Sequence, residues 1–219
     1  ALFPDLMDAA ADQTYFVDDV SFTKAELVVD NSGGGSGTGG GSSTVQSAVV
    51  TLDYNDPNAL GVEAFEGAVA AAGTQVDDAS ATQQMLQITK AAGGQAWAGV
   101  TIVNEADGSN LIADKSAPVT MTVYAPAAGS ITLKLEDTTS PVDNNNNPTV
   151  FIEVEATLTA GWNDVSFDVS GAPTGTFNKA ALFPDLMDAA ADQTYFVDDV
   201  SFTKAELVVD NSGGGSGTG

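Results

Sequence analysis

Carboxylates are the only side chains of this sequence that are numerous enough for acid–base or metal chemistry. The 219 residues contain 30 Asp and Glu against 6 Lys, with no His, Arg or Cys, and the net charge is −24. Without His and Cys the chain cannot form a Ser-His-Asp triad, a Cys-His pair or a tetrahedral zinc site. Two chemistries remain: glycoside hydrolysis by paired carboxylates, and binding of a hard cation such as Ca²⁺.

The candidates for a hydrolytic pair are Glu153 and Glu155, which lie two residues apart in an alternating segment. Residues i and i+2 of a strand share one face at a spacing of about 7 Å. This face is exposed and no cleft is implied, so we interpret both as solvated charges. We therefore predict that the protein is not an enzyme.

Charge and composition also restrict the partners of the chain. Without Arg there is no bidentate clamp for phosphate or guanine, and a charge of −24 repels polyanions, so we expect no nucleic-acid binding. The sequence has no run of 18 apolar residues, so we expect no membrane insertion. The acidic, Thr/Asn/Gly-rich composition favours an extracellular or cell-surface location.

The beginning of the sequence is repeated at its end. Residues Ala1–Gly39 recur letter for letter as Ala181–Gly219, a period of 180 residues. Such a period is too long for a solenoid, so we expect self-sufficient units joined by flexible Gly/Ser linkers. The predicted segments are the C-terminal end of a preceding unit (1–30), a linker (31–43), a repeat unit (44–210) and the start of the next linker (211–219).

Alternation of apolar and polar residues predicts strands throughout the unit. Apolar residues alternate with polar ones at Ile131, Leu133 and Leu135, and the pattern returns over 152–158 and 165–169. Further strands are expected at Ala48–Tyr54, Gly61–Glu66, Met85–Lys90, Ala96–Val103, Val119–Tyr124 and Tyr195–Phe202. We predict an all-β, antiparallel β-sandwich, jelly-roll-like and repeated in tandem through the Gly/Ser linker. Only Glu63–Ala72 and Pro184–Ala191 are candidates for a helical turn.

Several motifs, in order and at plausible spacing, resemble a known family. They are AFEG (Ala64–Gly67), WAGV (Trp97–Val100), VTMTVYAPAAGSITLKLED (Val119–Asp137), ATLTAGWNDVSFDVS (Ala156–Ser170), ALFPDL (Ala181–Leu186) and YFVDDVSF (Tyr195–Phe202). They resemble the bacterial carbohydrate-binding-module-like β-sandwich that is appended to laminarinase-type glycoside hydrolases and surface proteins. Many such modules bind glycans and others are spacers, so the resemblance implies the fold before the function.

The resemblance also implies a structural Ca²⁺ that ties the first strand to the last, with Glu66 and Asp198 at the matching positions. Asp198 is notable independently, because in a regular strand it shares a face with Phe196, Val200 and Phe202. A carboxylate that faces a core must be paired, and in a chain so poor in Lys a cation is a suitable partner. The alternative is a carboxylate hydrogen-bonded to backbone amides.

Glycan binding requires an exposed aromatic side chain on which a sugar can stack. The candidates are Trp97 and Tyr124, which have the opposite parity to the core residues of their predicted strands. Trp162 lies in the AGW turn of the family, where it usually packs. A packing role is also the alternative for the other two rings.

Two functions follow from these features. The first is a structural subunit of an extracellular tandem-repeat filament, fibre or adhesin stalk, whose partners are identical neighbouring repeats. There, Tyr15, Phe16, Val20 and Phe22 of the first copy would complete a neighbouring sandwich by strand complementation. The alternative is a non-catalytic carbohydrate-binding module that targets a polysaccharide.

Overall fold

A computed structural model describes residues 43–55, 61–73, 84–187 and 189–209 of the chain. Within these residues all regular structure is β, and no helix occurs. The strands are β1 (Ser43–Leu52), β2 (Glu63–Phe65), β3 (Ala68–Gly73), β4 (Met85–Lys90), β5 (Gly99–Asn104), β6 (Val119–Ala125), β7 (Gly129–Glu136), β8 (Phe151–Leu158), β9 (Gly161–Phe167), β10 (Lys179–Pro184) and β11 (Gln193–Val209).

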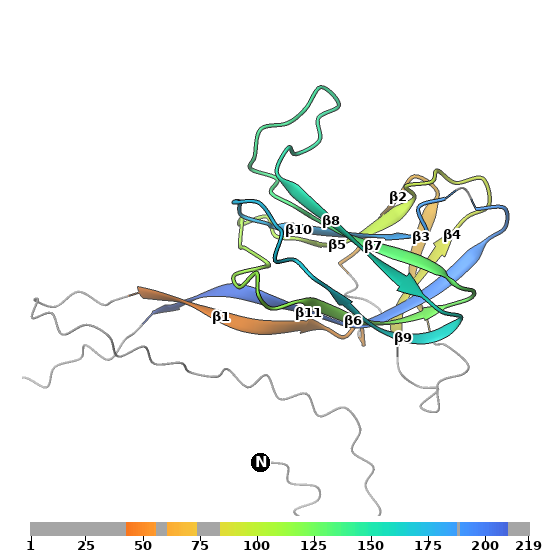
Figure 1. The fold of residues 1–219 in the computed structure, drawn as a ribbon, viewed down its shortest axis with the longest axis horizontal. Helices are drawn as coiled ribbons and strands as arrows, with labels where there is room; N and C mark the ends of the chain where they lie inside the picture. Colours follow the sequence, from red (N-terminus) through yellow and green to blue (C-terminus); the bar gives the residue numbers. More distant parts are fainter. Residues whose placement is uncertain (1–42, 56–60, 74–83, 188, 210–219) are drawn as a thin grey trace, which may run out of the picture.

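The strands form two antiparallel sheets that face each other (Figure 1). Sheet A has the order β3-β4-β11-β6-β9, and β1 pairs with β11 off this path. Sheet B has the order β2-β5-β10-β7-β8. The predicted all-β antiparallel sandwich is therefore confirmed, whereas the tandem arrangement lies outside the described residues.

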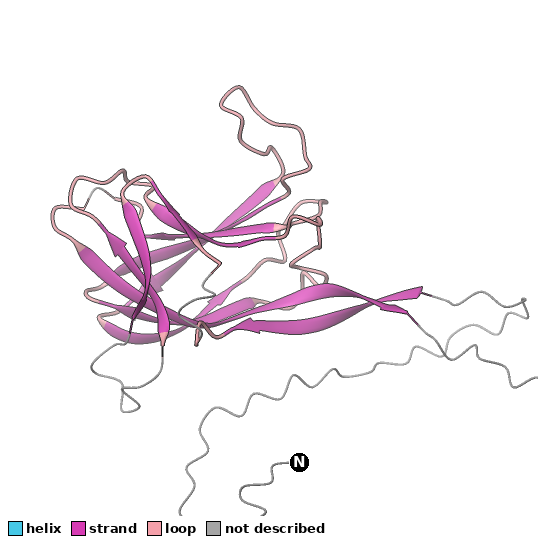
Figure 2. Cartoon of the chain, turned by 180° about the vertical axis from the view of Figure 1, so that it is seen from behind, coloured by secondary structure: helices cyan, strands magenta, loops and turns pink. Residues whose placement is uncertain are grey.

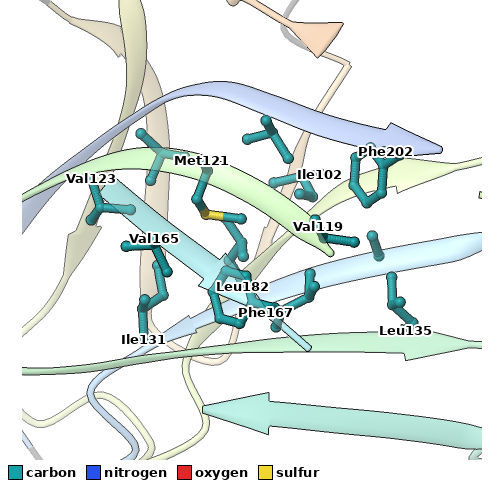
Figure 3. Packing of buried hydrophobic residues seen from close by; sticks show 14 of the residues in the cluster. Ile102, Val119, Met121, Val123, Ile131, Leu135, Val165, Phe167, Leu182 and Phe202 are labelled. Carbon is teal, nitrogen blue, oxygen red and sulfur yellow. The ribbon is translucent and has the colours of Figure 1, made fainter. Parts of the chain in front are cut away.

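The core lies between the sheets and follows the period-2 pattern of the sequence. From sheet A, the fully buried side chains include Val123 and Phe167, and from sheet B they include Ile131, Leu135 and Leu182. Figure 3 shows these residues pointing toward one another from the two layers. β6 and β9 bury alternate residues, so the polar residues in between remain on the outer face of sheet A.

Lys90 is a fully buried cation at the end of β4. Its ammonium donates to the carbonyl oxygens of Ala96, at 2.8 Å, and of Pro184, at 3.1 Å, and also to that of Asp185. Hydrogen bonds of this kind offset the cost of removing the charge from water. Lys90 thus joins β4 to the end of β10.

Neither of the two predicted helical turns forms in the described residues. Glu66 and Gly67 have left-handed backbones, with φ of 56° and 97°, and they form the turn between β2 and β3. The Ala-rich segment that follows pairs as β3 with β4 over its whole length, because β4 offers an open edge there. The segment after Pro184 turns through Asp185, whose φ is 44°, instead of entering a helix.

A β-bulge in β11 corrects the predicted orientation of that strand. Tyr195 and Val197 face the core, so Phe196 lies on the outer face of sheet A, and the register to β6 then shifts between Asp198 and Ser201. Asp199 absorbs the extra residue with a φ of 51°. Phe196 therefore does not share a face with Val200 and Phe202, which are buried after the bulge.

Strand β11 also extends well beyond the sandwich. Its residues 200–209 pair with all ten residues of β1, and the two strands form a ribbon that projects from the two sheets (Figure 2). The segment 1–42, with Tyr15, Phe16, Val20 and Phe22, lies outside the described residues. The predicted strand complementation by these four residues stays a prediction.

Candidate functional site

Glu66 and Asp198 lie near opposite ends of β4. Glu66 is exposed in the β2–β3 turn, two residues before Ala68, which pairs with Lys90. Asp198 follows Val197, which pairs with Leu86 at the other end of β4. The two ends are four residues apart, or roughly 13 Å. Glu66 and Asp198 therefore do not fit a shared Ca²⁺, and the described residues contain no cluster of three or more acidic side chains that could hold a metal ion.

Asp198 is buried at the bulge of β11 and has a backbone amide as one hydrogen-bond partner. The side chain is buried, with 3% of its surface exposed, and its Oδ1 accepts a hydrogen bond of 2.9 Å from the amide of Asp199. Burial, reinforced by the negative charge of Asp198, holds the pKa of the Tyr54 hydroxyl well above its ordinary value. A backbone amide thus supplies one partner of the buried carboxylate.

The two aromatic residues predicted as glycan ligands are not neighbours. Trp97 lies in the connection before β5 and is 52% exposed, and Tyr124 lies on the outer face of β6. The neighbours of Tyr124 are Trp162 and Phe196, which come from the adjacent strands β9 and β11. The structure therefore pairs Tyr124 with Trp162, the ring expected to pack in a turn, and not with Trp97.

These three rings form a row across sheet A, which we call the aromatic row (Tyr124, Trp162 and Phe196). The centroids of Tyr124 and Trp162 are 5.5 Å apart with an interplanar angle of 70°, and those of Tyr124 and Phe196 are 6.1 Å apart at 71°. Both are edge-to-face pairs, which hold the rings in fixed orientations. Trp162 is 37% exposed and lies at the open end of the row, on the edge strand β9.

A polar hollow of about 330 Å³ lies beside the aromatic row on the same outer face. It is formed by β6, β9 and the bulged part of β11, and its lining includes two carboxylates, Asp164 and Asp199, and no Lys. The remaining lining residues are Thr120, Met121, Thr122, Val165, Ser166 and Ser201. The bulge in β11 matters here, because it turns the exposed Asp199 toward solvent beside the hollow.

The outer face of sheet B has a different chemistry, because four of its charged side chains form ion pairs with one another. Glu136 forms ion pairs with Lys179, at 2.9 Å, and with Lys134, at 3.1 Å. Lys134 also contacts Glu153, at 3.4 Å, and lies 4.9 Å from the ring centroid of Phe151. Since these groups satisfy one another, this face is the less suitable of the two for a ligand.

Trp162 and Phe196 were missed as site residues, although the sequence held a signal for the first. In the predicted alternation, residues 165, 167 and 169 face the core, so residue 162 has the outward parity of Asp164 and Asp168. For Phe196 there was no local signal, because its orientation depends on the bulge that follows it. The described part of the chain contains no helix that is long and apolar enough to cross a membrane.

No family model and no curated protein matches the chain. Among solved structures, it is similar to an arabinose-bound α-L-arabinofuranosidase, with 17% identity over 68% of this chain and a TM-score of 0.47, and it spans 24% of that enzyme. The CBM22-2 xylan-binding domain from Paenibacillus barcinonensis Xyn10C is 15% identical over 71% of this chain and 98% of that domain, with a TM-score of 0.43. The family 29 carbohydrate-binding module CBM29-2 is 11% identical over 72% of this chain and 86% of that module, with a TM-score of 0.47.

Proposed function

We propose that this protein is a non-catalytic glycan-binding module whose ligand lies on the outer face of sheet A. The observation that supports this proposal is the position of the aromatic row directly beside the polar hollow. Sugar rings carry apolar C–H faces and polar hydroxyl edges, so they require both kinds of surface at one place. The outer face of sheet A offers the two side by side.

In this arrangement the exposed ring of Trp162 is the stacking surface for one sugar residue. The neighbouring hydroxyls of the sugar then reach the hollow, where Asp164 and Asp199 accept hydrogen bonds and Thr120, Thr122, Ser166 and Ser201 can donate or accept. Tyr124 holds Trp162 in place through the edge-to-face contact. Because the rings and strands are already arranged, binding orders few side chains.

The charge of the site indicates an uncharged glycan. Two carboxylates and no Lys line the hollow, and the whole chain carries −24, so a polyuronate or a sulfated glycan would be repelled. A neutral polysaccharide keeps the hydrogen bonds without that repulsion. An extracellular location, where such polymers occur, is part of the same proposal.

Titration calorimetry with soluble neutral polysaccharides, such as xylan, mixed-linkage β-glucan and galactomannan, tests the proposal. The variant is Trp162→Ala, and the matched control is Trp97→Ala, because both tryptophans are exposed but only Trp162 belongs to the aromatic row. Loss of a central aromatic contact costs about 1.5–2 kcal/mol, so Trp162→Ala should bind at least about tenfold more weakly. Trp97→Ala should bind like the unmodified chain.

Two results would contradict the proposal. One is that the unmodified chain binds none of the neutral polysaccharides. The other is that Trp97→Ala loses affinity while Trp162→Ala keeps it, which would move the site away from sheet A.

A structural role in a tandem-repeat filament or adhesin stalk remains the second hypothesis. The letter-for-letter repeat of Ala1–Gly39 favours it. The contacts among the described residues lie within one sandwich and one ribbon, so this role stays a prediction.

A further inference from the structure

Among the described residues, both edges of the ribbon of β1 and β11 are open along most of its length. On one side of β11, β4 pairs as far as Val197 and β1 continues from Val200. On the other side, β6 pairs only as far as Ser201, and past that point Thr203 accepts one backbone hydrogen bond, from Ala113. Among the described residues, β1 itself pairs only with β11.

An open edge of this kind binds another strand readily. Alternate residues of β1 direct their N–H and C=O groups away from β11, and an antiparallel strand could pair with them. The side chains do not protect the edge, since Val49 is 60% and Val50 is 37% exposed.

The sequence contains a second copy of the segment that pairs with β1. Residues 20–29 have the same sequence, letter for letter, as residues 200–209. The latter pair with β1 at ten consecutive positions, from Ser43 opposite Val209 to Leu52 opposite Val200. The side chains of 20–29 therefore suit an antiparallel neighbour of the β1 sequence.

The chain connectivity places that strand within reach of the open edge. Residues 30–42 connect 20–29 to the start of β1, and this Gly/Ser-rich stretch is long enough for a hairpin connection. A linker of this kind gives an effective concentration on the order of 1 mM. A second molecule in a dilute solution cannot compete with that concentration.

We propose that residues 20–29 bind the open edge of β1 as a third antiparallel strand of the ribbon. β1 then lies between two copies of one sequence, 20–29 on one edge and 200–209 on the other. In a chain with further repeats, the same pairing would join the last strand of one unit to the first strand of the next. This interaction is independent of glycan binding on sheet A.

Hydrogen exchange of the β1 peptide, residues 43–54, measures this pairing directly, because its sequence occurs once in the chain. About half of its amides point to β11 and half to the open edge. We expect both halves to be protected in the full chain, and we expect equal protection at 1 and at 100 μM protein. The variant Ala25→Pro with Glu26→Pro should remove protection from the open-edge half only, because Pro lacks the N–H and distorts the strand.

The matched control is Ala205→Pro with Glu206→Pro, the same change in the second copy. It should remove protection from the other half, since Ala205 and Glu206 pair with Ser47 and Gln46. Exchange in the core peptide 131–135 reports whether each variant keeps its sandwich. Fast exchange of half the β1 amides in the unmodified chain would overturn the proposal, as would unchanged protection in the first variant. Protection that falls on dilution would assign the strand to a second molecule and would equally overturn it.

Discussion

Replacing Glu136 by Gln tests whether the charge cluster on the outer face of sheet B stabilises the fold. The side chain of Glu136 is 7% exposed and holds two ammonium groups, Lys179 at 2.9 Å and Lys134 at 3.1 Å. Gln has the same shape but no charge. It can accept a hydrogen bond from one of the two Lys side chains, while the other loses its contact with residue 136.

The magnitude follows from burial and distance. At about 3 Å and an effective dielectric constant of about 20, each pair contributes about 5 kcal/mol of Coulomb attraction. Desolvation offsets most of this, and removing one member of a buried pair usually costs about 3–5 kcal/mol. Since Lys134 and Lys179 remain 18% and 31% exposed, we expect Glu136→Gln to lower the free energy of unfolding by about 2–3 kcal/mol.

The effect should depend on pH in a defined direction. Burial of Glu136 alone would raise the pKa of its carboxyl, but the hydrogen bond and charge of Lys179, together with Lys134, lower that pKa below its ordinary value of 4.5. The folded state therefore favours the ionised form, and the stabilisation is complete above about pH 4.5. It is lost as the pH falls through the lowered pKa of the folded state.

Urea unfolding followed by tryptophan fluorescence, at pH 7 and at a series of lower pH values, measures the difference between Glu136→Gln and the unmodified chain. The control is Glu153→Gln, which removes a 48% exposed carboxylate 3.4 Å from Lys134 and should cost no more than about 1 kcal/mol. Equal losses in the two variants at pH 7 would refute the reasoning. So would a difference for Glu136→Gln that persists at a pH well below 4.5.

Two further predictions concern buried charges. Lys90→Met should lower the free energy of unfolding by about 3 kcal/mol or more in the same urea assay, because the carbonyls of Ala96 and Pro184 lose their ammonium donor. A loss of less than about 1 kcal/mol would contradict the role given to Lys90. Calcium binding stays a prediction. If an ion binds at Asp198, excess chelator should lower the melting temperature of the unmodified chain. The melting temperature of Asp198→Asn should then not change with chelator. Glu66→Gln should respond like the unmodified chain, since Glu66 lies near the other end of β4; identical melting curves with and without chelator would exclude an ion at Asp198.

The fold class and most strands could be predicted from the sequence, because period-2 alternation is a local property of each strand. The segments around Ile131 and 152–158 alternate strictly and lie within β7 and β8, and residues 165–167 of the third segment form the end of β9. β3 could not be predicted in the same way. Its residues, AVAAAG, carry no alternation in polarity, and Ala favours helix, so only the edge offered by β4 makes this segment a strand.

The candidate site was predicted only in part. The outward parity of Tyr124 is confirmed by its place on the outer face of β6, but the ring that packs against Tyr124 there is Trp162 and not Trp97. The alternation in the sequence fixes on which face of its own strand a residue lies. It does not reveal which strands become neighbours, and Tyr124 meets Trp162 and Phe196 only because β9, β6 and β11 lie next to one another in sheet A.

The sequence by itself determined the exclusion of chemistries that need His, Cys or Arg, the antiparallel sandwich and the duplicated end, because these depend on composition, identity and local periodicity. The surroundings of Asp198 depend instead on the bulge in β11. The tertiary structure alone decided the separation of Glu66 from Asp198, the bulge that turns Asp199 outward, and the ribbon with its open edges. Each of these depends on pairing between segments far apart in the chain, such as β1 with β11, where the partner and the register are chosen by the packing of the whole sandwich.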